Sequence, residues 1–332
     1  MSESREPQSS NEPLQYAKDR YPMSRRRFLT RATQGLAIAY MTNTAATEAL
    51  WPPNEPELLP LDYSQNLMRS RRQKEGWIIA DGLGHQDALP EATAFAHYAL
   101  HNQQPMSYFK YSNQGITAES LAPLIADYAK QFEHLSVVGN SLGGIAILEA
   151  TRQAVVNHGR PIHLRRVVLI CSPFNLHDTK QEGIARAVAR FNPRGGFTGE
   201  VLYNAVGALG HGPYDPFTIG ADITSSFDKT LHGIPPSLWT GQLALGANTD
   251  LGANWQDFQT HNIITPDTKA LFCAPEDLAR DGLVYDDRAF HNYKPFFNQF
   301  GVTLDYLSVP DAGHADVPLT SRSAEPWIRA TM

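Results

Sequence analysis

Short apolar runs recur along the chain from about residue 76 onward, and stretches with helical spacing separate them. Several of these runs are continuous instead of alternating with polar residues, which is typical of strands covered on both faces. The predicted strands are residues 77–80, 106–111, 135–139, 166–171, 270–274 and 304–309. The predicted helices are residues 91–101, 118–132, 145–157 and 290–300.

The alternation of strands and helices predicts an α/β fold with a mostly parallel sheet flanked by helices. One interval breaks the alternation, because no convincing core strand lies between residues 171 and 268. It contains helical pieces near residues 183–191, 201–209 and 222–231, broken by glycine and proline. We therefore expect a helical cap or lid, inserted at about residues 173–267 between two strands of the sheet.

The N-terminal segment, residues 1–48, differs from the rest of the chain. A polar stretch leads to Ser24-Arg25-Arg26-Arg27-Phe28-Leu29, and an uncharged run follows. This resembles a twin-arginine signal, so we expect the twin-arginine export machinery to carry the protein to the periplasm, the cell envelope or the exterior. The signal is either cleaved or kept as an uncut anchor. The alternative is a basic amphipathic helix or a cytosolic tail.

Residues 49–60 contain four prolines and predict an extended linker, because proline blocks both helix formation and strand pairing. The folded body is therefore expected to begin near Leu61 and to comprise residues 61–332.

The composition of the 332 residues excludes several classes of protein. A hydrophobic fraction of 42% and a charged fraction of 19% support a large core and exclude wholesale disorder. The net charge of −6 argues against a nucleic-acid partner, since such proteins usually carry a basic face. No run approaches the ~18 apolar residues that cross a bilayer. The two cysteines, Cys171 and Cys273, exclude a disulfide-rich scaffold and are expected to be free buried thiols, with a bridge as the alternative.

The strongest chemical signal follows the strand at residues 135–139. There the chain reads Gly139-Asn140-Ser141-Leu142-Gly143-Gly144 and continues into an apolar helix. This is G-x-S-x-G in the strand–turn–helix context, where the serine lies on a strained turn with its hydroxyl projecting above the sheet. Side chains in place of the flanking glycines would collide with the neighbouring strand and helix. The helix N-terminus adds N–H groups beside the hydroxyl, so Ser141 is the predicted nucleophile.

With this motif, residues 76–327 resemble an α/β-hydrolase of the lipase/esterase type. The resemblance implies a serine hydrolase that cleaves a small-molecule or lipid ester through an acyl-enzyme on Ser141. An acyltransferase with the same residues is the alternative, and a catalytically silent binding module is less favoured because the expected residues are present. No organic cofactor is required. No metal is expected either, since the chain has no H-E-x-x-H and no paired cysteines.

The family's chain order of Ser, then Asp or Glu, then His directs the search for the other catalytic groups. His314 follows the last predicted strand, where the family keeps its general base. Two residues compete for the acid. Asp277 is favoured by its distance of three residues from the strand end, whereas Asp281 begins the D-x-L-V pattern whose apolar pair folds back onto the core. We favour Asp281; the other reading of either residue is a turn or a helix cap.

Two backbone amides are expected to form an oxyanion hole. One is the amide of Leu142, directly after the nucleophile, and the other is that of Leu83, after the first core strand. Lipases commonly have His-Gly in that loop, whereas this chain has Asp81-Gly82, which leaves the subtype open. The large apolar residues of the predicted lid are expected either to meet a lipid-like substrate at a membrane surface or to pack onto the core: Phe227, Leu231, Leu238, Trp239 and Trp255.

Overall fold

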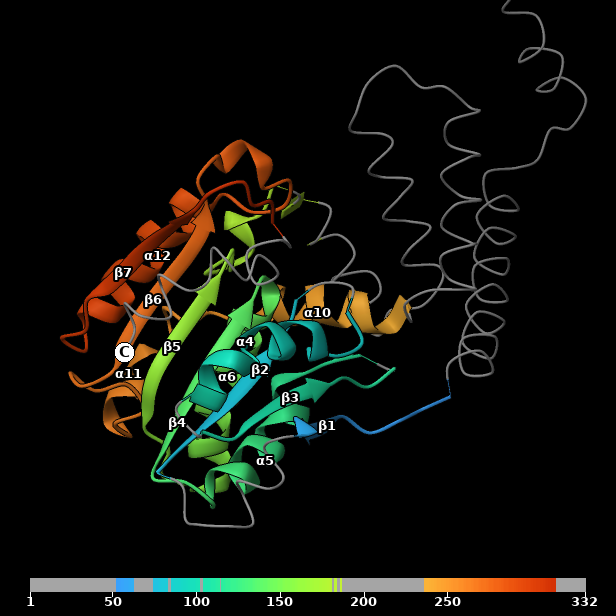
Figure 1. Cartoon of the computed structure of the whole chain (residues 1–332), viewed down its shortest axis with the longest axis vertical. Helices are drawn as coiled ribbons and strands as arrows, with labels where there is room; N and C mark the ends of the chain where they lie inside the picture. Colours follow the sequence, from blue (N-terminus) through green and yellow to red (C-terminus); the bar gives the residue numbers. More distant parts are fainter. Residues whose placement is uncertain are drawn as a thin grey trace, which may run out of the picture. The chain divides into compact units, whose positions relative to one another are not determined.

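The computed structural model describes residues 52–62, 74–82, 85–101, 104–113, 115–180, 182–183, 186 and 236–314 (Figure 1). The predicted export signal therefore lies outside the described residues, as does most of the predicted lid. Of the lid's apolar side chains, those of Phe227, Leu231 and Trp239 are outside the description.

A seven-stranded sheet forms the centre of the described residues, in the spatial order β1-β3-β2-β4-β5-β6-β7. Every neighbouring pair is parallel except β1 with β3. The strands are β1 (Glu57–Pro60), β2 (Glu75–Ala80), β3 (Met106–Lys110), β4 (His134–Asn140), β5 (Leu164–Ile170), β6 (Lys269–Pro275) and β7 (Leu304–Val309). The predicted α/β fold is confirmed, and all six predicted strands are present with ends within two residues of those expected.

The continuous apolar runs arise because both faces of the sheet are covered. Successive side chains of a strand point to opposite faces. On β4, Val137 belongs to one apolar core and Val138 to a second core on the other face. On β2, Ile78 and Ile79 divide in the same way, so no position of either pair is left for a polar residue.

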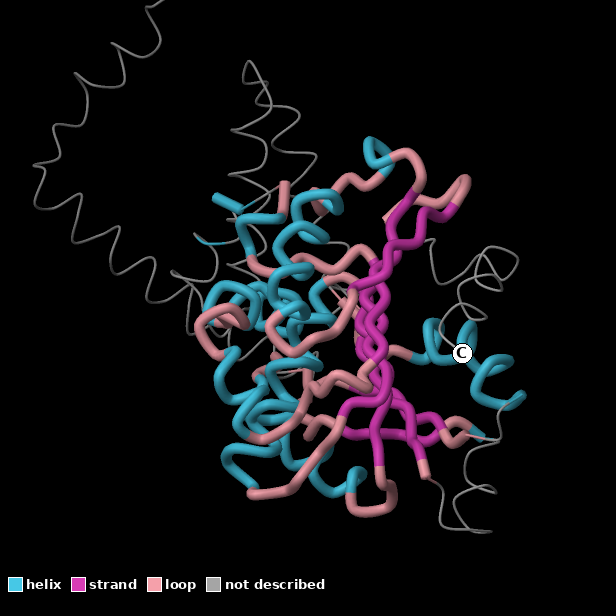
Figure 2. Tube along the Cα trace, turned by 90° about the vertical axis from the view of Figure 1, so that its left-hand side faces the viewer, coloured by secondary structure: helices cyan, strands magenta, loops and turns pink. Residues whose placement is uncertain are grey.

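The helices cover the two faces unequally, and Figure 2 shows most of the described helices on one side of the sheet. Residues of α5, α6, α11 and α12 contribute to one core, and α4 contributes Ala92 and Phe95 to the other. A reciprocal pair of hydrogen bonds between Thr117 and Ser120 caps the start of α5. The described helices are α4 (Leu89–His101), α5 (Ala118–Ala129), α6 (Leu142–His158), α10 (Pro236–Asn248), α11 (Trp255–Thr260) and α12 (Asp286–Asn298).

The prediction that residues 49–60 form an unpaired linker is wrong for its last four residues. Residues 57–60 are the edge strand β1, in which Pro60 pairs with Ser107 of β3. Just before β1, Asn54 accepts a hydrogen bond from the Asn113 amide at 2.6 Å. Proline is tolerated in an edge strand because one side of that strand carries no ladder bonds. The folded body therefore begins before Leu61.

The described residues between β5 and β6 hold the short helix η1 (Leu176–Asp178), α10 and α11, and no strand of the sheet. This agrees with the expected helical insertion. Of its large apolar residues, Leu238 is fully buried in the core and Trp255 packs against the same core. For these two, the core-packing alternative is the one the structure shows.

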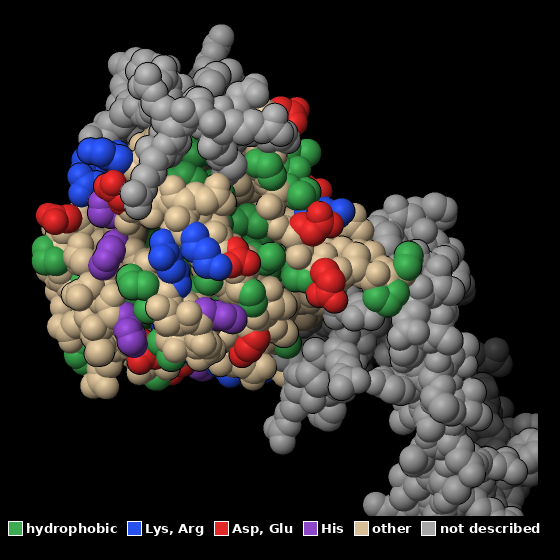
Figure 3. Space-filling view, turned by 90° about the horizontal axis from the view of Figure 1, so that it is seen from below, with side chains coloured by type: hydrophobic (Ala, Val, Ile, Leu, Met, Phe, Trp, Pro, Cys, Tyr) green, Lys and Arg blue, Asp and Glu red, His purple; other side chains and the backbone are tan. Residues whose placement is uncertain are grey.

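The surface carries mixed side chains. On the face shown in Figure 3, acidic, basic, imidazole and hydrophobic groups are interspersed over the described residues. Among the helices that are described, none combines the length and the apolar character needed to cross a membrane.

Candidate active site

Ser141 lies on the turn between β4 and α6 with a φ of +50°, a left-handed conformation that is rare outside glycine. The glycines around it make this turn sterically feasible. A Cβ on Gly143 would lie 2.5 Å from the Ala80 carbonyl oxygen, and a Cβ on Gly139 would overlap the backbone of Gly144. The G-x-S-x-G pattern thus follows from the close approach of β2, β4 and α6.

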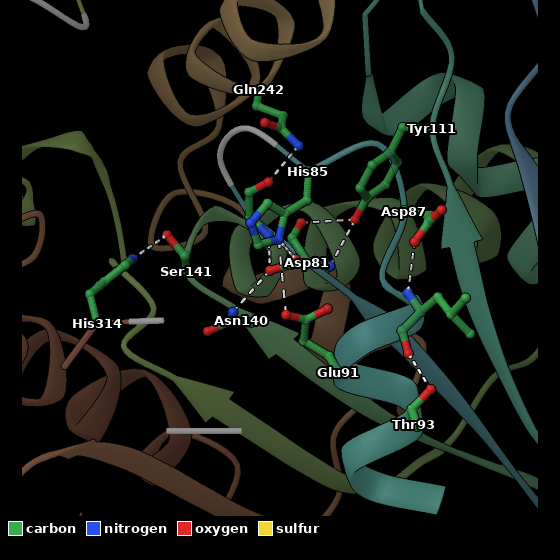
Figure 4. A network of polar contacts seen from close by, with 12 residues as sticks. Asp81, His85, Asp87, Glu91, Thr93, Tyr111, Asn140, Ser141, Gln242 and His314 are labelled. Carbon is green, nitrogen blue, oxygen red and sulfur yellow. Dashed lines mark hydrogen bonds and ion pairs between the residues drawn. The ribbon is translucent and has the colours of Figure 1, made fainter. Parts of the chain in front are cut away.

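The structure brings three of the predicted site residues into one hydrogen-bonded chain. His314 Nε2 lies 2.9 Å from Ser141 Oγ, and His314 Nδ1 lies 2.7 Å from Asp281 Oδ2 (Figure 4 shows the Ser141 contact). Ser141 comes from the end of β4, Asp281 from the loop after β6 and His314 from the loop after β7. The two loops meet at Ser141 because the carboxyl ends of parallel strands lie at the same edge of the sheet.

Of the two candidate acids, Asp281 is the one that contacts His314. Asp277 instead caps the short helix η2 (Leu278–Arg280), where its carboxylate accepts the Ala279 amide at 3.1 Å. Val284 of the D-x-L-V pattern is buried in the core, and Leu283 packs against it. The Asp277 alternative would have required Arg280 in the place of that valine, and Arg280 is exposed.

The surroundings of Asp281 hold its carboxylate in a fixed orientation. Its side chain is fully buried, and Oδ1 accepts the amides of Leu283 and Val284, both at 2.8 Å. Burial alone would raise the pKa of Asp281, but the hydrogen bond from His314 and the charge of its imidazole outweigh burial and leave that pKa below its usual value. The carboxylate is therefore charged at neutral pH and can stabilise a protonated His314.

Asp286, at the start of α12, is a further buried carboxyl that the sequence did not single out. It is 1% exposed and lies against the Asp281 side chain. Burial, and next the charge of Asp281, raise the pKa of Asp286 to about 9. Asp286 therefore keeps its proton at neutral pH.

Replacing Asp286 by asparagine is expected to raise the melting temperature, with a larger gain at pH 8 than at pH 5. In the unfolded chain an aspartate loses its proton near pH 4, whereas Asp286 in the fold keeps it up to about pH 9. Between these values the unfolded state binds fewer protons, so wild-type stability falls as the pH rises. Asparagine cannot ionise and removes this loss. Thermal unfolding at both pH values tests this, with exposed Asp287→Asn as the control; equal shifts at both would contradict it.

Only one of the two predicted oxyanion amides can be placed. Leu142 is the first residue of α6, so its N–H has no acceptor within the helix. Leu83 lies outside the described residues. Its neighbour Gly82 is described and approaches the nucleophile closely, because a Cβ there would lie 2.9 Å from Ser141 Oγ. The Gly82 carbonyl accepts a hydrogen bond from Gln242 Nε2 of α10 at 2.6 Å.

Asp81, which stands where lipases commonly have histidine, ties the loop after β2 to the nucleophile turn (Figure 4). Its Oδ1 accepts the Gly82 amide at 2.6 Å and Asn140 Nδ2 at 2.9 Å. The Tyr111 hydroxyl donates to the Asp81 carbonyl at 2.8 Å and accepts its amide at 2.9 Å. The departure from His-Gly thus places a buried acceptor beneath the turn that carries Ser141.

The other side of Asp81 faces two more titratable groups. Its Oδ2 is ion-paired with His85 Nδ1, and Glu91 of α4 lies next to them. Burial, and next the charge of Asp81, raise the pKa of Glu91 to about 8. The side-chain hydrogen bond to Asp81 raises the pKa of His85.

The two cysteines are free and buried, as expected. Burial raises the pKa of both thiols, which keeps them protonated and poorly nucleophilic. Cys171 lies beside Asp281 and His314, and one ligating atom from each of the three falls within 4.8 Å of the others. Asp281 and His314 are already engaged with each other and with Ser141.

Comparisons with known proteins concern the fold. No family model and no curated protein matches the sequence. Among solved structures, the chain is similar to a carboxylesterase of Nitrososphaera gargenis, with 11% identity, a TM-score of 0.48 and coverage of 84% of this chain and 97% of that chain.

It is also similar to the monoacylglycerol lipase of Paleococcus ferrophilus, with 12% identity, a TM-score of 0.46 and coverage of 77% of this chain and 95% of that chain. A hydrolase from Oleispira antarctica has 13% identity and a TM-score of 0.46, with coverage of 86% of this chain and 96% of that chain. The chemistry of this chain therefore has to come from its own side chains.

Proposed function

We propose that this protein is a serine hydrolase that cleaves a carboxylic ester. The observation that carries the proposal is the continuous chain of contacts from Ser141 Oγ through the His314 ring to the buried Asp281 carboxylate. His314 Nε2 takes the hydroxyl proton as Ser141 attacks the ester carbonyl, and returns it to the leaving alcohol. Water, deprotonated by the same histidine, then releases the acid from the acyl-enzyme.

The oxyanion that forms during the attack needs donors beside Ser141, and we assign them to the amides of Leu142 and Leu83. The N-terminus of α6 supports the first assignment, because its free N–H groups and its dipole favour negative charge there. Two contacts support the second. Gly82 lies against Ser141, and Gln242 holds the Gly82 carbonyl, which belongs to the same planar peptide unit as the Leu83 amide.

A fluorophosphonate probe tests for an activated serine without a known substrate. We expect it to label the wild-type protein on Ser141 and to leave Ser141→Ala unlabelled. Heat-denatured wild-type protein is the control for non-specific labelling. A folded wild-type protein that resists the probe would favour the alternative of a silent binding module. If labelling occurs, competition between water and an added alcohol separates ester hydrolysis from acyl transfer.

We also propose that the twin-arginine segment directs the protein out of the cytoplasm. Replacing Arg25 and Arg26 together by lysine should retain it inside the cell, because the receptor reads the guanidinium pair and lysine does not reproduce its geometry. Cell fractionation measures this, with Arg27→Lys as the control variant. Normal export of the double variant would contradict the proposal.

A further inference from the structure

Behind the loop that follows β2, three side chains with metal-ligating atoms converge: Asp81 at the end of β2, His85 in the loop and Glu91 in the first turn of α4. Figure 4 shows their polar ends directed toward one another. One ligating atom from each lies within 4.8 Å of the other two. The group is separate from Ser141, His314 and Asp281, although Asp81 touches the turn that carries Ser141 through Asn140.

Both carboxylates of this group are withdrawn from water. Asp81 and Glu91 are each 2% exposed, so neither carboxyl group is hydrated. Glu91 Oε2 is buried and has no hydrogen-bond partner among the residues that the structure describes, and Glu91 Oε1 lies 3.9 Å from His85 Nδ1. A buried carboxylate oxygen without a donor costs free energy, and buried charges are usually paired or bound to a metal. The single imidazole is already in contact with Asp81, so Glu91 Oε2 gains no partner from it.

We propose that Asp81, His85 and Glu91 bind a divalent transition-metal ion such as Zn²⁺ or Mn²⁺. One imidazole with two carboxylates suits these ions, whereas Ca²⁺ and Mg²⁺ favour sites made of oxygen alone. Zinc takes nitrogen and oxygen ligands at about 2.0–2.2 Å, which separates two ligands of one ion by no more than about 4.4 Å. The three side chains therefore need only small adjustments to meet around one ion.

The surroundings provide the other parts of such a site. Asp81 would bind the ion through Oδ2, while Oδ1 keeps its bonds to the Gly82 amide and Asn140 and so stays oriented. The side chain of His85 is 44% exposed, which leaves a path for the ion and room for water to complete its coordination. The ion would fasten His85 to α4.

The group at Cys171, Asp281 and His314 is the rival location for an ion. There, Asp281 uses Oδ1 for the Leu283 and Val284 amides and Oδ2 for His314, and the second nitrogen of His314 contacts Ser141. No carboxylate oxygen of that group is left without a partner. The unpartnered Glu91 oxygen therefore favours the group at His85.

Isothermal titration of the chelator-treated full-length protein with Zn²⁺, and separately with Mn²⁺, tests the proposal. We expect one ion per chain for at least one of the two metals, with a rise in melting temperature. Glu91→Gln, which is nearly isosteric, and His85→Ala, at a half-exposed position, should each weaken binding by about 100-fold or more, since even second-shell changes cost 10–100-fold.

The matched control is His177→Ala, because His177 forms a 2.6 Å pair with a single carboxylate, Glu182, and should bind the metal as the wild type does. His314→Ala should also keep the site, and Ser141→Ala should bind unchanged even if Ser141 is not a nucleophile. Absence of binding by both metals, or binding lost in His314→Ala and kept in His85→Ala, would overturn the proposal.

Discussion

Ser141→Ala is expected to lower kcat by about 10⁴-fold or more while the protein stays folded. The Ser141 hydroxyl lies 2.9 Å from His314 Nε2 and sits at the start of α6. Alanine removes the nucleophile without adding bulk to the crowded turn. His314→Ala should cause a loss of similar size, because it removes the imidazole that contacts the hydroxyl.

The rates should be measured on an ester substrate together with circular dichroism and melting temperature. Ser136→Ala is a suitable control. Ser136 is buried near the start of β4, at the opposite end of the strand from Ser141, and its hydroxyl bonds to Glu75 of β2. It should keep near-normal kcat even if stability falls. Near-normal turnover by folded Ser141→Ala would overturn the proposed function.

The fold was predictable because its strongest signals are local. A strand covered on both faces reads as an apolar run, as in β2 and β4, and all six strands predicted from the sequence are present. The edge strand β1 was missed because it is only four residues long, lies at the surface and ends in Pro60. Helix α10 was missed for a different reason: it is apolar with two internal glycines and lacks the alternation of faces that marks a surface helix.

The residues of the candidate site that directly follow predicted strands could be found from the sequence. Ser141, Asp281 and His314 each follow a strand, and the order of the three along the chain is that of the family they resemble. Gln242 carries no such signal, because its bond to the Gly82 carbonyl joins residues 160 positions apart. The buried carboxyls Glu91 and Asp286 look like ordinary first-turn helix residues, and only packing shows that neither is solvated.

Asp281→Asn is expected to lower kcat by up to about 10⁴-fold, whereas Asp277→Asn should leave it nearly unchanged. The Asp281 carboxylate accepts the His314 Nδ1 proton at 2.7 Å, which leaves Nε2 free to accept the proton of Ser141. An asparagine there can present its amide group to Nδ1, which favours the wrong tautomer and removes the negative charge that stabilises the imidazolium.

Asp277 is the matched control, because the same change four residues earlier removes a carboxylate that caps η2 at the surface. Asparagine keeps an oxygen that can accept the Ala279 amide and caps helices about as well as aspartate, so both kcat and melting temperature should stay close to wild type. Both replacements are close in shape to the original side chain, so a difference in rate between two folded variants is chemical. An inactive Asp277→Asn beside an active Asp281→Asn would mean that the loop after β6 changes its arrangement when the substrate binds. Equal mild losses would move the search for the acid to Glu276, which precedes both.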